Sequence, residues 1–554
     1  MIMTNIKNTI EKSISNTCNY KSVQVETSSN EKFGDFSTNI ALKDKEINPE
    51  EVVNKINFEA DLPFTASVVG RFINFKIKDE YLVDNLKNVD ENYGKSDLSK
   101  GKLAIVEYSS PNIAKPFGVG HLRSTVIGDS VANLLEAVGY KVMRDNHLGD
   151  WGTQFGKVIC AIKKWGNIKE IENSDSPIDE LVRLYVKFHE ESEKDEALND
   201  ESRLWFKKLE DGDIEARKLW QQCVDWSFIE FEKIYNLLNI KFDKSFNDGR
   251  GLGESFFESR MSEVVNELSE KKMLKEGENG AKLVFFENDK YPPLMILKKD
   301  GTTLYSTRDL ATDKYRKQKY DPDLIVNEVG SEQGLYFKQI IELEKILGWY
   351  KDGQRVHVGH GLFLTGGKKM STRAGKTVKL EDVLNEAVKK AMSLQKGEQN
   401  IDGAKMVGIG AIKYFDLLHH PLTNINFDWD KMLSLDGNSG PYLQYTVARI
   451  NSLLEKSNNK EDKSSNVNLN DEERSVLRTL VNYKNIVESA AISYSPNVLC
   501  NYLYELASKF NTFYNKHKII NDENEAFRLK VSKSVGTVLK NGLSLLGIQT
   551  PERM

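Results

Sequence analysis

The chain has 554 residues, which at about 150 residues per domain predicts three or four domains. Hydrophobic residues make up 39% of it and charged residues 29%, so a disordered or collagen-like chain is excluded. The net charge is −5, with 77 basic and 82 acidic residues, and a partner as anionic as nucleic acid would therefore have to meet local basic patches.

The four cysteines, Cys18, Cys160, Cys223 and Cys500, lie far apart, without a Cys-x-x-Cys pair or a Cys/His cluster. This spacing argues against a disulfide framework and against a structural metal site. The first residues, MIMTNIKNTIEKSISN, lack the apolar centre of a signal peptide, and no apolar run approaches the ~18 residues that cross a bilayer. We therefore expect a cytoplasmic protein with no membrane association.

The composition changes along the chain and predicts three domains. Residues 1–88 are expected to form an N-terminal α+β add-on domain, which a polar joint separates from a catalytic domain over 95–425. A charged, helix-forming segment near 161–248 resembles an insertion into that domain. Residues 426–554 have an all-α pattern, interrupted by a polar stretch at 456–473 that is typical of a solvated loop.

The catalytic domain begins with a strand, a loop, a helix and a strand. Residues 103–108, LAIVEY, form a short apolar run typical of a buried parallel strand. An amphipathic helix is expected from Val119 to Val138, where Gly139 ends it, and YKVMRDN at 140–146 is the next strand. This βαβ pattern predicts an α/β fold with a doubly wound, Rossmann-like parallel sheet and a ligand at the carboxyl ends of its strands. Further strand-like segments occur at 282–288, 293–299 and 323–329.

The loop before the predicted helix has the composition of a phosphate-binding loop. Pro111 stiffens it, Gly118 and Gly120 allow close backbone approach, and His121 lies near the helix N-terminus, whose unpaired N–H groups favour an anion. A dinucleotide fingerprint would need a glycine at position 123, where the chain has Arg123. A nucleotide-binding oxidoreductase is therefore disfavoured.

The segments SPNIAKPFGVGHLRST (110–125) and DNHLGDWGTQFG (145–156) resemble the signature region of class I aminoacyl-tRNA synthetases, and of the arginyl enzymes in particular. Those families carry H-x-G-H at the head of the first helix, where it contacts ATP. Gly118 replaces the first histidine here, and His121 matches the second. HVGH also occurs literally at 357–360, but it alternates like a strand and no helix follows it, so strand histidines are expected there.

GGKKMSTRAGK (366–376) resembles the second class I signature, K-M-S-K-S. A glycine-flanked loop with Lys369, Ser371 and Arg373 can fold over a triphosphate and neutralise its charge, although a solvated basic loop is the alternative for this segment alone. Thr372 replaces the second lysine of the motif, and the resemblance implies that Lys115 substitutes for it. The catalytic residues that it implies are Lys115, His121, Lys369, Ser371 and Arg373. Those implied for ATP are Pro111, Asn112, Lys115, Gly118, Gly120, His121, Lys369, Met370 and Ser371.

The segment GTTLYSTRDLATDKYR (301–316) carries a candidate pocket for a cation. It places Tyr305 and Asp309 four residues apart, which is one face of a helix, and a carboxylate is the natural partner of a planar guanidinium. Taken alone, Asp309 would more readily be an acid on a helix surface. The arginine-binding residues that the resemblance implies are Glu107, Ser110, Asn112, Tyr305, Asp309 and Gln333.

The segment DGNSGPYLQYTVARINSLLEK (436–456) resembles the anticodon-binding helical domain of the same enzymes. Tyr442 and Tyr445 lie three apart at a helix start and could stack on unpaired bases, with core packing as the alternative. The resemblance also implies tRNA contacts at Met554 and, in the N-terminal domain that carries FGDFSTN, at Asn74.

The resemblance as a whole implies ATP-dependent ligation of L-arginine to tRNA(Arg) through an arginyl-adenylate. It implies ATP with Mg²⁺ as the substrate complex, no structural metal, a cytoplasmic location and a monomer. A class I synthetase for another amino acid is one alternative, but the cysteinyl and methionyl enzymes usually carry zinc-binding cysteines, which this chain lacks. A non-catalytic tRNA-binding paralogue, which Gly118 makes conceivable, is the other.

Overall fold

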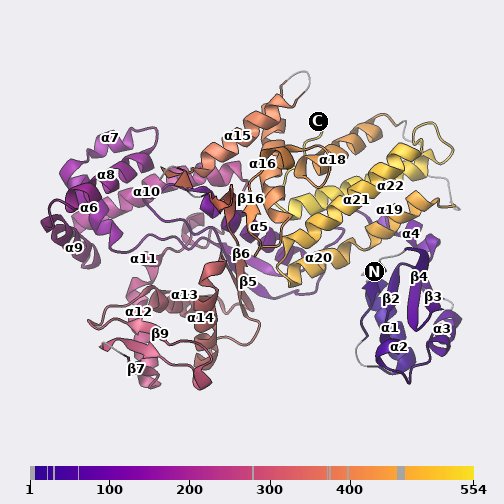
Figure 1. Ribbon diagram of the computed structural model, residues 1–554, viewed down its shortest axis with the longest axis horizontal. Helices are drawn as coiled ribbons and strands as arrows, with labels where there is room; N and C mark the ends of the chain where they lie inside the picture. The colour runs from indigo at the N-terminus through magenta and orange to yellow at the C-terminus, as the bar shows by residue number, and fades with distance from the viewer. Residues whose placement is uncertain are drawn as a thin grey trace.

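The computed structural model describes residues 6–20, 23–28, 31–59, 61–277, 280–370, 372–373, 376–395, 399–457 and 468–554. A parallel sheet lies near the middle of an elongated molecule (Figure 1). The helical insertion lies at one end, and the C-terminal helices lie at the other, with the N-terminal domain packed beneath them (Figure 1). Within the described part of the chain, every helix is too short or too polar to span a membrane.

The central sheet contains four parallel strands in the order β11-β10-β5-β6. They are β5 (Leu103–Glu107), β6 (Lys141–Asp145), β10 (Leu324–Gly330) and β11 (Arg355–His360). The predicted strands at 103–108, 140–146 and 323–329 are thus confirmed, as is the strand that contains HVGH. The chain turns in opposite directions from β5 and β10, which makes the carboxyl ends of these two neighbours the switch point where ligands bind.

Both faces of the sheet are covered, as a continuous apolar strand requires. Ala104 and Val106 belong to one buried cluster together with residues of α5 (Leu122–Ala137). Ile105, which points the other way, belongs to a second cluster with α13 (Tyr305–Tyr320) and α14 (Gly334–Leu347). The doubly wound α/β architecture that was predicted is therefore present.

The helix α5 differs from the amphipathic helix that its spacing predicted. A 3₁₀ turn, Val119–His121, precedes it, and it ends before Gly139, whose φ of 98° suits a glycine stop. Nearly all of its side chains are buried, because helices of the C-terminal region, α16 (Ile401–Leu417), α20 (Tyr483–Ile492) and α22 (Glu525–Leu545), also contact it. These contacts with distant helices explain why the local sequence pattern did not predict the full burial of α5.

Two modules separate β6 from β10 in the chain. The first is the predicted helical insertion, with α6 (Gln154–Trp165), α7 (Ile168–Glu172), α8 (Pro177–Ser192), α9 (Ala197–Glu210) and α10 (Ile214–Leu237). The second contains the strand-like segments at 282–288 and 293–299, which do not join the parallel sheet. They form an antiparallel sheet below α11 (Glu254–Phe257) and α12 (Met261–Glu270), with strands β7 (Leu274–Glu276), β8 (Lys282–Val284) and β9 (Leu294–Leu297).

The region from Trp429 onward is helical, as the pattern predicted for residues 426–554. Its further helices are α17 (Trp429–Leu433), α18 (Gly440–Glu455), α19 (Asp471–Val481) and α21 (Pro496–Lys516), and α15 (Leu380–Ser393) precedes them in the chain. Most of the predicted loop at 456–473 lies outside the described residues, since 458–467 are not described, and its last residues begin α19.

The N-terminal domain is α+β, with an antiparallel sheet in the order β1-β2-β4-β3. Its elements are α1 (Ile6–Cys18), β1 (Glu26–Thr27), β2 (Phe36–Thr38), α2 (Ile40–Lys43), α3 (Pro49–Phe58), β3 (Phe64–Val69), β4 (Phe72–Ile77) and α4 (Asp79–Asn85).

A buried ion pair joins the N-terminal domain to the C-terminal helices. The guanidinium of Arg474, on α19, donates to both carboxylate oxygens of Asp35, at 3.1 and 2.9 Å. It also donates to Asp79 at 2.9 Å and to the carbonyl oxygen of Ile77 at 3.0 Å. The Asp35 side chain is only 1% exposed. This acid of the FGDFSTN segment therefore helps to hold the N-terminal domain against the C-terminal helices.

Replacing Asp35 by asparagine is expected to lower the free energy of unfolding by about 3–5 kcal/mol, because Arg474 would keep a buried charge without its bidentate partner. Urea denaturation of the full chain measures this loss. Asp61→Asn, an exposed acid of the same domain, is the matched control and should change stability little. Equal stability of the two variants would contradict a role for the Asp35–Arg474 pair in domain docking.

Candidate active site

The two segments that resemble nucleotide-binding signatures are joined by backbone hydrogen bonds. The amide of Val119 donates to the carbonyl of Val378 at 3.0 Å, and the amide of Leu380 donates to the carbonyl of Phe117 at 2.9 Å. A bridge between Gly118 and Lys379 completes this contact. The chain that leaves the second signature is therefore fixed against the loop that begins α5.

The first signature loop leaves β5 through strained backbone. Ser109 and Ser110 both adopt left-handed conformations, with φ of 71° and 46°, although neither is glycine. The Ser109 amide donates to the Ser124 hydroxyl at 3.0 Å, and the Ser110 amide donates to the Asn146 side chain at 3.1 Å. Such conformations persist where surrounding contacts hold them, and they cluster at functional sites.

The N-terminus of α5 presents the residues that were predicted for ATP. His121 is half-buried, and its ring lies 5.2 Å from that of Phe117. Gly120 is exposed, and a side-chain carbon added there would meet open space, so its backbone is accessible to a ligand. Lys115 is also exposed, whereas Pro111 and Gly118 are buried within the loop.

The second signature lies partly outside the described residues. It follows β12 (Phe363–Thr365), and the amide of Met370 donates to the carbonyl of Phe363 at 2.9 Å. Ser371 lies outside the described residues, as do the side chains of Lys369 and Arg373. The roles expected for these three residues therefore stay predictions.

A cavity of about 290 Å³ lies at the switch point of the sheet. Its walls come from the ends of β5 and β10, from the first signature loop, and from α13 and α14. All six residues predicted for arginine line it: Glu107, Ser110, Asn112, Tyr305, Asp309 and Gln333. The structure thus brings the whole predicted set to one cavity.

Polar atoms without a hydrogen-bond partner gather around this cavity. Among the described residues that line it, Ser110 Oγ, His147 Nε2 and Asn327 Oδ1 are buried and have none. Most buried polar atoms in proteins are satisfied, so a cluster of exceptions indicates a polar ligand.

Most of the acids at the cavity already have a partner within the protein. Arg316 pairs with Glu107 at 2.5 Å, with Asp145 at 2.7 Å and with Asp313 at 3.2 Å. Arg355 forms an ion pair with the other carboxylate oxygen of Asp313. In these buried pairs Arg316 balances the negative charge of Glu107, and the role expected for Glu107 in binding arginine stays a prediction. Although burial opposes ionisation, Arg316 lowers the pKa of Glu107 to about 2.

Asp309 differs from these acids, since no lysine or arginine in the described part of the chain forms an ion pair with it. Its carboxylate accepts a hydrogen bond of 2.5 Å from the hydroxyl of Tyr336, whose ring lies 5.0 Å from that of Tyr305. Burial raises the pKa of Asp309, while His147 and the Tyr336 hydroxyl act in the opposite direction. A desolvated carboxylate without a lysine or arginine partner has the chemistry that a cation from outside would need.

Sequence reasoning missed Asp313, Arg316, His147 and Tyr336. Helical spacing could have found the first two, because Asp309, Asp313 and Arg316 fall at positions i, i+4 and i+7 of one helix face. His147 lies just after β6 and could have been found from the rule that ligands meet strand ends. Nothing in the local pattern of α14 marks Tyr336 as the partner of Asp309.

The HVGH segment at 357–360 is structural, as its alternation predicted. His357 lies on β11, with its Nε2 3.1 Å from the carbonyl oxygen of Val329 and its ring stacked on Phe337 at 4.4 Å. His360 Nδ1 lies 2.9 Å from the carboxylate of Glu328. Both rings therefore have partners within the fold.

The residues predicted for the anticodon lie on the surface of the helical domain. Tyr442 and Tyr445 are half-buried near the start of α18, and Met554 is 47% exposed. The guanidinium of Arg449 lies 4.9 Å from the ring centre of Tyr445 and 5.2 Å from that of Tyr514. Sequence reasoning missed Arg449, although it lies one helical turn after Tyr445.

Asn74 lies on β4, paired with Ser37 of β2 and Ser67 of β3, and only 4% of it is exposed. Because side chains alternate along a strand, Asn74 shares its face of β4 with the exposed Phe72 and Lys76. The tRNA contact expected at Asn74 stays a prediction. The neighbouring Phe72, at the start of β4, is 45% exposed.

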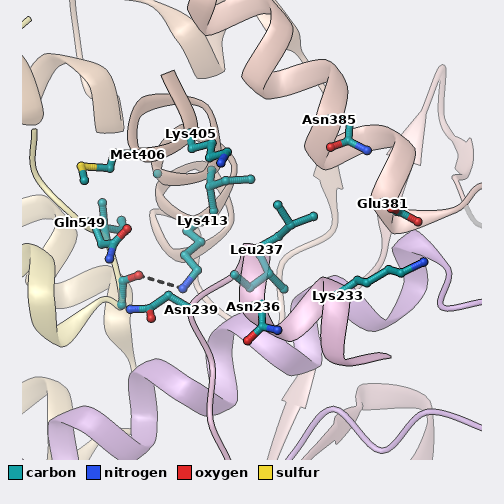
Figure 2. Close-up of a pocket in the computed structure, with 15 residues that line it drawn as sticks. Lys233, Asn236, Leu237, Asn239, Glu381, Asn385, Lys405, Met406, Lys413 and Gln549 are labelled. Carbon is teal, nitrogen blue, oxygen red and sulfur yellow. Dashed lines mark hydrogen bonds between the residues drawn. The ribbon is translucent and has the colours of Figure 1, made fainter. Parts of the chain in front are cut away.

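A larger cavity, of about 580 Å³, lies away from the signatures, between α10, α15, α16 and the C-terminal residues (Figure 2). The Lys413 ammonium donates to the carbonyl oxygen of Gly547 at 2.8 Å across it. None of the residues predicted for ATP or arginine lines it, so its size does not make it the catalytic site. Among the described residues, no group of histidine, cysteine and acidic side chains could hold a metal ion.

The doubly wound sheet, with its cavity at the switch point, belongs to a class I aminoacyl-tRNA synthetase. Residues 83–429 match the family model of the class I (R) tRNA synthetase catalytic domain. Residues 443–554 match the DALR anticodon binding domain, and residues 2–77 match the arginyl tRNA synthetase N-terminal domain. The chain belongs to the arginyl-tRNA synthetases.

Individual relatives agree with this assignment. The chain is 41% identical over 518 residues to the arginine–tRNA ligase of Clostridium botulinum, which covers 91% of this chain and 90% of the relative. The ligase of Enterococcus faecalis is 43% identical over 516 residues, covering 91% and 89%. Among solved structures, the arginyl-tRNA synthetase of Plasmodium falciparum has a TM-score of 0.84 at 27% identity and covers 100% of both chains. That of Thermus thermophilus, with a TM-score of 0.82 at 22% identity over 99% and 100%, supports the fold.

Proposed function

We propose that this enzyme ligates L-arginine to tRNA(Arg) in two steps. The arginine carboxylate attacks the α-phosphate of Mg-ATP, and pyrophosphate leaves, which gives arginyl-adenylate. A ribose hydroxyl of the terminal tRNA adenosine then attacks the activated carbonyl, and AMP leaves. The observation that supports arginine as the substrate is the carboxylate of Asp309 in the switch-point cavity, which forms no ion pair with any described lysine or arginine.

The specificity for arginine rests on charge and shape. Asp309 supplies the negative charge for the guanidinium, and Tyr305, at the N-terminus of the same helix, lines the cavity beside it. Glu107 contributes a second carboxylate, which also forms an ion pair with Arg316. Ser110, Asn112 and Gln333 are the candidates for the amino and carboxyl groups of the substrate, because they line the cavity from the segments that follow β5 and β10.

The chemistry needs no covalent nucleophile from the protein. Catalysis arises from holding the carboxylate and the α-phosphate together and from stabilising charge that develops on phosphate oxygens. His121, the N-terminus of α5 and Lys115 are the candidates on one side of the triphosphate. Lys369, Ser371 and Arg373, with Met370 beside them, are the candidates on the other side. Mg²⁺ enters as part of the ATP complex.

Charging of tRNA with radiolabelled arginine tests the proposed function directly. Purified enzyme, ATP, Mg²⁺ and total tRNA should yield acid-precipitable arginine, and mild base should hydrolyse the product and release free arginine, as expected for an ester. A chain that binds tRNA but forms no ester would instead be a non-catalytic paralogue. We further propose that the enzyme works in the cytoplasm as a monomer, which light scattering of the full chain with and without tRNA can check.

Replacing Tyr445 by alanine is expected to raise the KM for tRNA by about tenfold, because stacking of a base on an aromatic ring contributes ~1–3 kcal/mol. Tyr445→Phe, which keeps the ring, should remain within about twofold of the wild type. Initial rates of aminoacylation at varied tRNA concentration measure both. An unchanged KM in the alanine variant would show that the Tyr445–Arg449 surface does not bind the anticodon loop.

A further inference from the structure

His147 lies at the arginine cavity without a role in the reaction described above. It follows β6 by two residues and lines the cavity together with Glu107 and Asp309. Its Nδ1 is 3.1 Å from the carbonyl oxygen of Leu252. A carbonyl oxygen only accepts, so Nδ1 carries a hydrogen, while the buried Nε2 has no hydrogen-bond partner.

The groups that face His147 come from several elements and are mostly acidic. Glu107 faces it from β5, Asp309 from α13 and Glu254 from α11, and Asp150 lies nearby in the loop after β6. Arg316, from α13, is the opposing cation, but it is already paired with Glu107, Asp145 and Asp313. Burial lowers the pKa of His147, but Glu107 and Asp309 outweigh this effect, and the pKa lies above its ordinary value of 6.5.

This arrangement gives the cavity a cation of its own when no substrate is present. A protonated imidazole beside Asp309 reduces the cost of a desolvated carboxylate that lacks an ion pair. The substrate guanidinium brings a second positive charge to the same carboxylate. Two cations in one buried cavity repel each other, and the imidazole is the one that can lose its proton.

We propose that His147 carries the counter-charge of the empty cavity and releases its proton to solvent when arginine binds. The charge balances, since the bound guanidinium replaces one proton on Nε2. The neutral ring, held by Leu252 with its hydrogen on Nδ1, then has a lone pair on Nε2. This inference rests on the proposed function, because it takes arginine as the occupant of the cavity.

The replacement of the His147 proton by the substrate guanidinium also gives specificity for a charged substrate. An arginine analogue with a urea in place of the guanidinium, citrulline, is neutral and cannot replace the imidazolium charge. It would have to bind beside a protonated His147 or leave Asp309 without a cation. The exchange therefore disfavours neutral isosteres while allowing a cation of the same shape.

The pH dependence has a defined sign. Because arginine displaces a proton, its affinity falls as the pH falls through the titration of His147, by at most tenfold per pH unit for one proton. The pKa of Asp309 is raised above its ordinary value of 3.8. Protonation of Asp309 therefore weakens arginine binding further at more acid pH. His147→Gln should remove the fall in arginine affinity near neutral pH and leave the fall that Asp309 causes at acid pH.

Isothermal titration of the full chain with arginine, in two buffers that differ in ionisation enthalpy, counts the released protons. Wild type should release a fraction of a proton per arginine between pH 6 and pH 7.5 (a range about His147's ordinary pKa, ~6.5), and His189→Gln, a histidine of the insertion, should match it. His147→Gln should bind arginine with no proton release and a flat affinity over this range.

Saturable arginine binding by the wild type with no proton release would overturn the proposal, as would equal release by wild type and His147→Gln. Absence of arginine binding by the wild type would instead contradict the proposed function, so the two failures are distinguishable. If the variant does not fold, the wild-type proton count and the pH dependence of its arginine Kd still decide the question.

Discussion

Replacing Asp309 by asparagine is expected to reduce kcat/KM for arginine by about 10³-fold in the activation step, with the KM for ATP nearly unchanged. Loss of one partner of a buried, hydrogen-bonded charge pair costs ~3–5 kcal/mol, which corresponds to about that factor. The effect should be this large because, among the described residues, every other carboxylate that lines the cavity already pairs with an arginine. Arginine-dependent pyrophosphate exchange measures it.

Asp321→Asn is the matched control for this experiment. Asp321 ends the same helix, is exposed, and adopts a left-handed conformation that asparagine tolerates. Its substitution should leave activation within about twofold of the wild type. If Asp309→Asn activated arginine as well as this control does, the specificity of the cavity would need another explanation.

Replacing His121 by alanine is expected to lower kcat for adenylate formation by about 10²–10³-fold, the range seen when one donor to a developing oxyanion is removed. Gly118 replaces the first histidine of the signature, so the chain has no second imidazole at this end of α5 to compensate. The KM for arginine should change little, since His121 does not line the arginine cavity. Single-turnover formation of adenylate gives the rate.

The control for His121 is His189→Gln, because His189 lies on α8 in the insertion and lines no part of the cavity. It should retain the wild-type rate. A His121→Ala enzyme with unchanged kcat would mean that the amides at the N-terminus of α5 serve ATP without this side chain.

The βαβ core and the arginine cavity could be predicted because their signals are local. LAIVEY is apolar on both faces, and the glycine and proline pattern after it marks the loop that is proposed to bind the phosphate. Tyr305 and Asp309 lie one helical turn apart, so their common direction follows from helix geometry. Glu107 and Gln333 were implied only by the family resemblance, and both line the cavity at the carboxyl ends of β5 and β10.

The remaining features depend on contacts between distant parts of the chain. Asp35 and Arg474 are separated by more than four hundred residues, and neither segment alone marks them as partners. The full burial of α5 depends on C-terminal helices that its own spacing cannot reveal. The burial of Asn74 follows from strand pairing on both sides of β4, which requires the sheet order as well as the strand pattern.

Pyrophosphate exchange with each of the twenty amino acids, in the presence and absence of total tRNA, tests the central claim most directly. The account predicts ATP formation with arginine in the presence of tRNA and no comparable signal with the other nineteen. Exchange that is strongest with another amino acid would contradict the assignment of the cavity around Asp309 to a guanidinium.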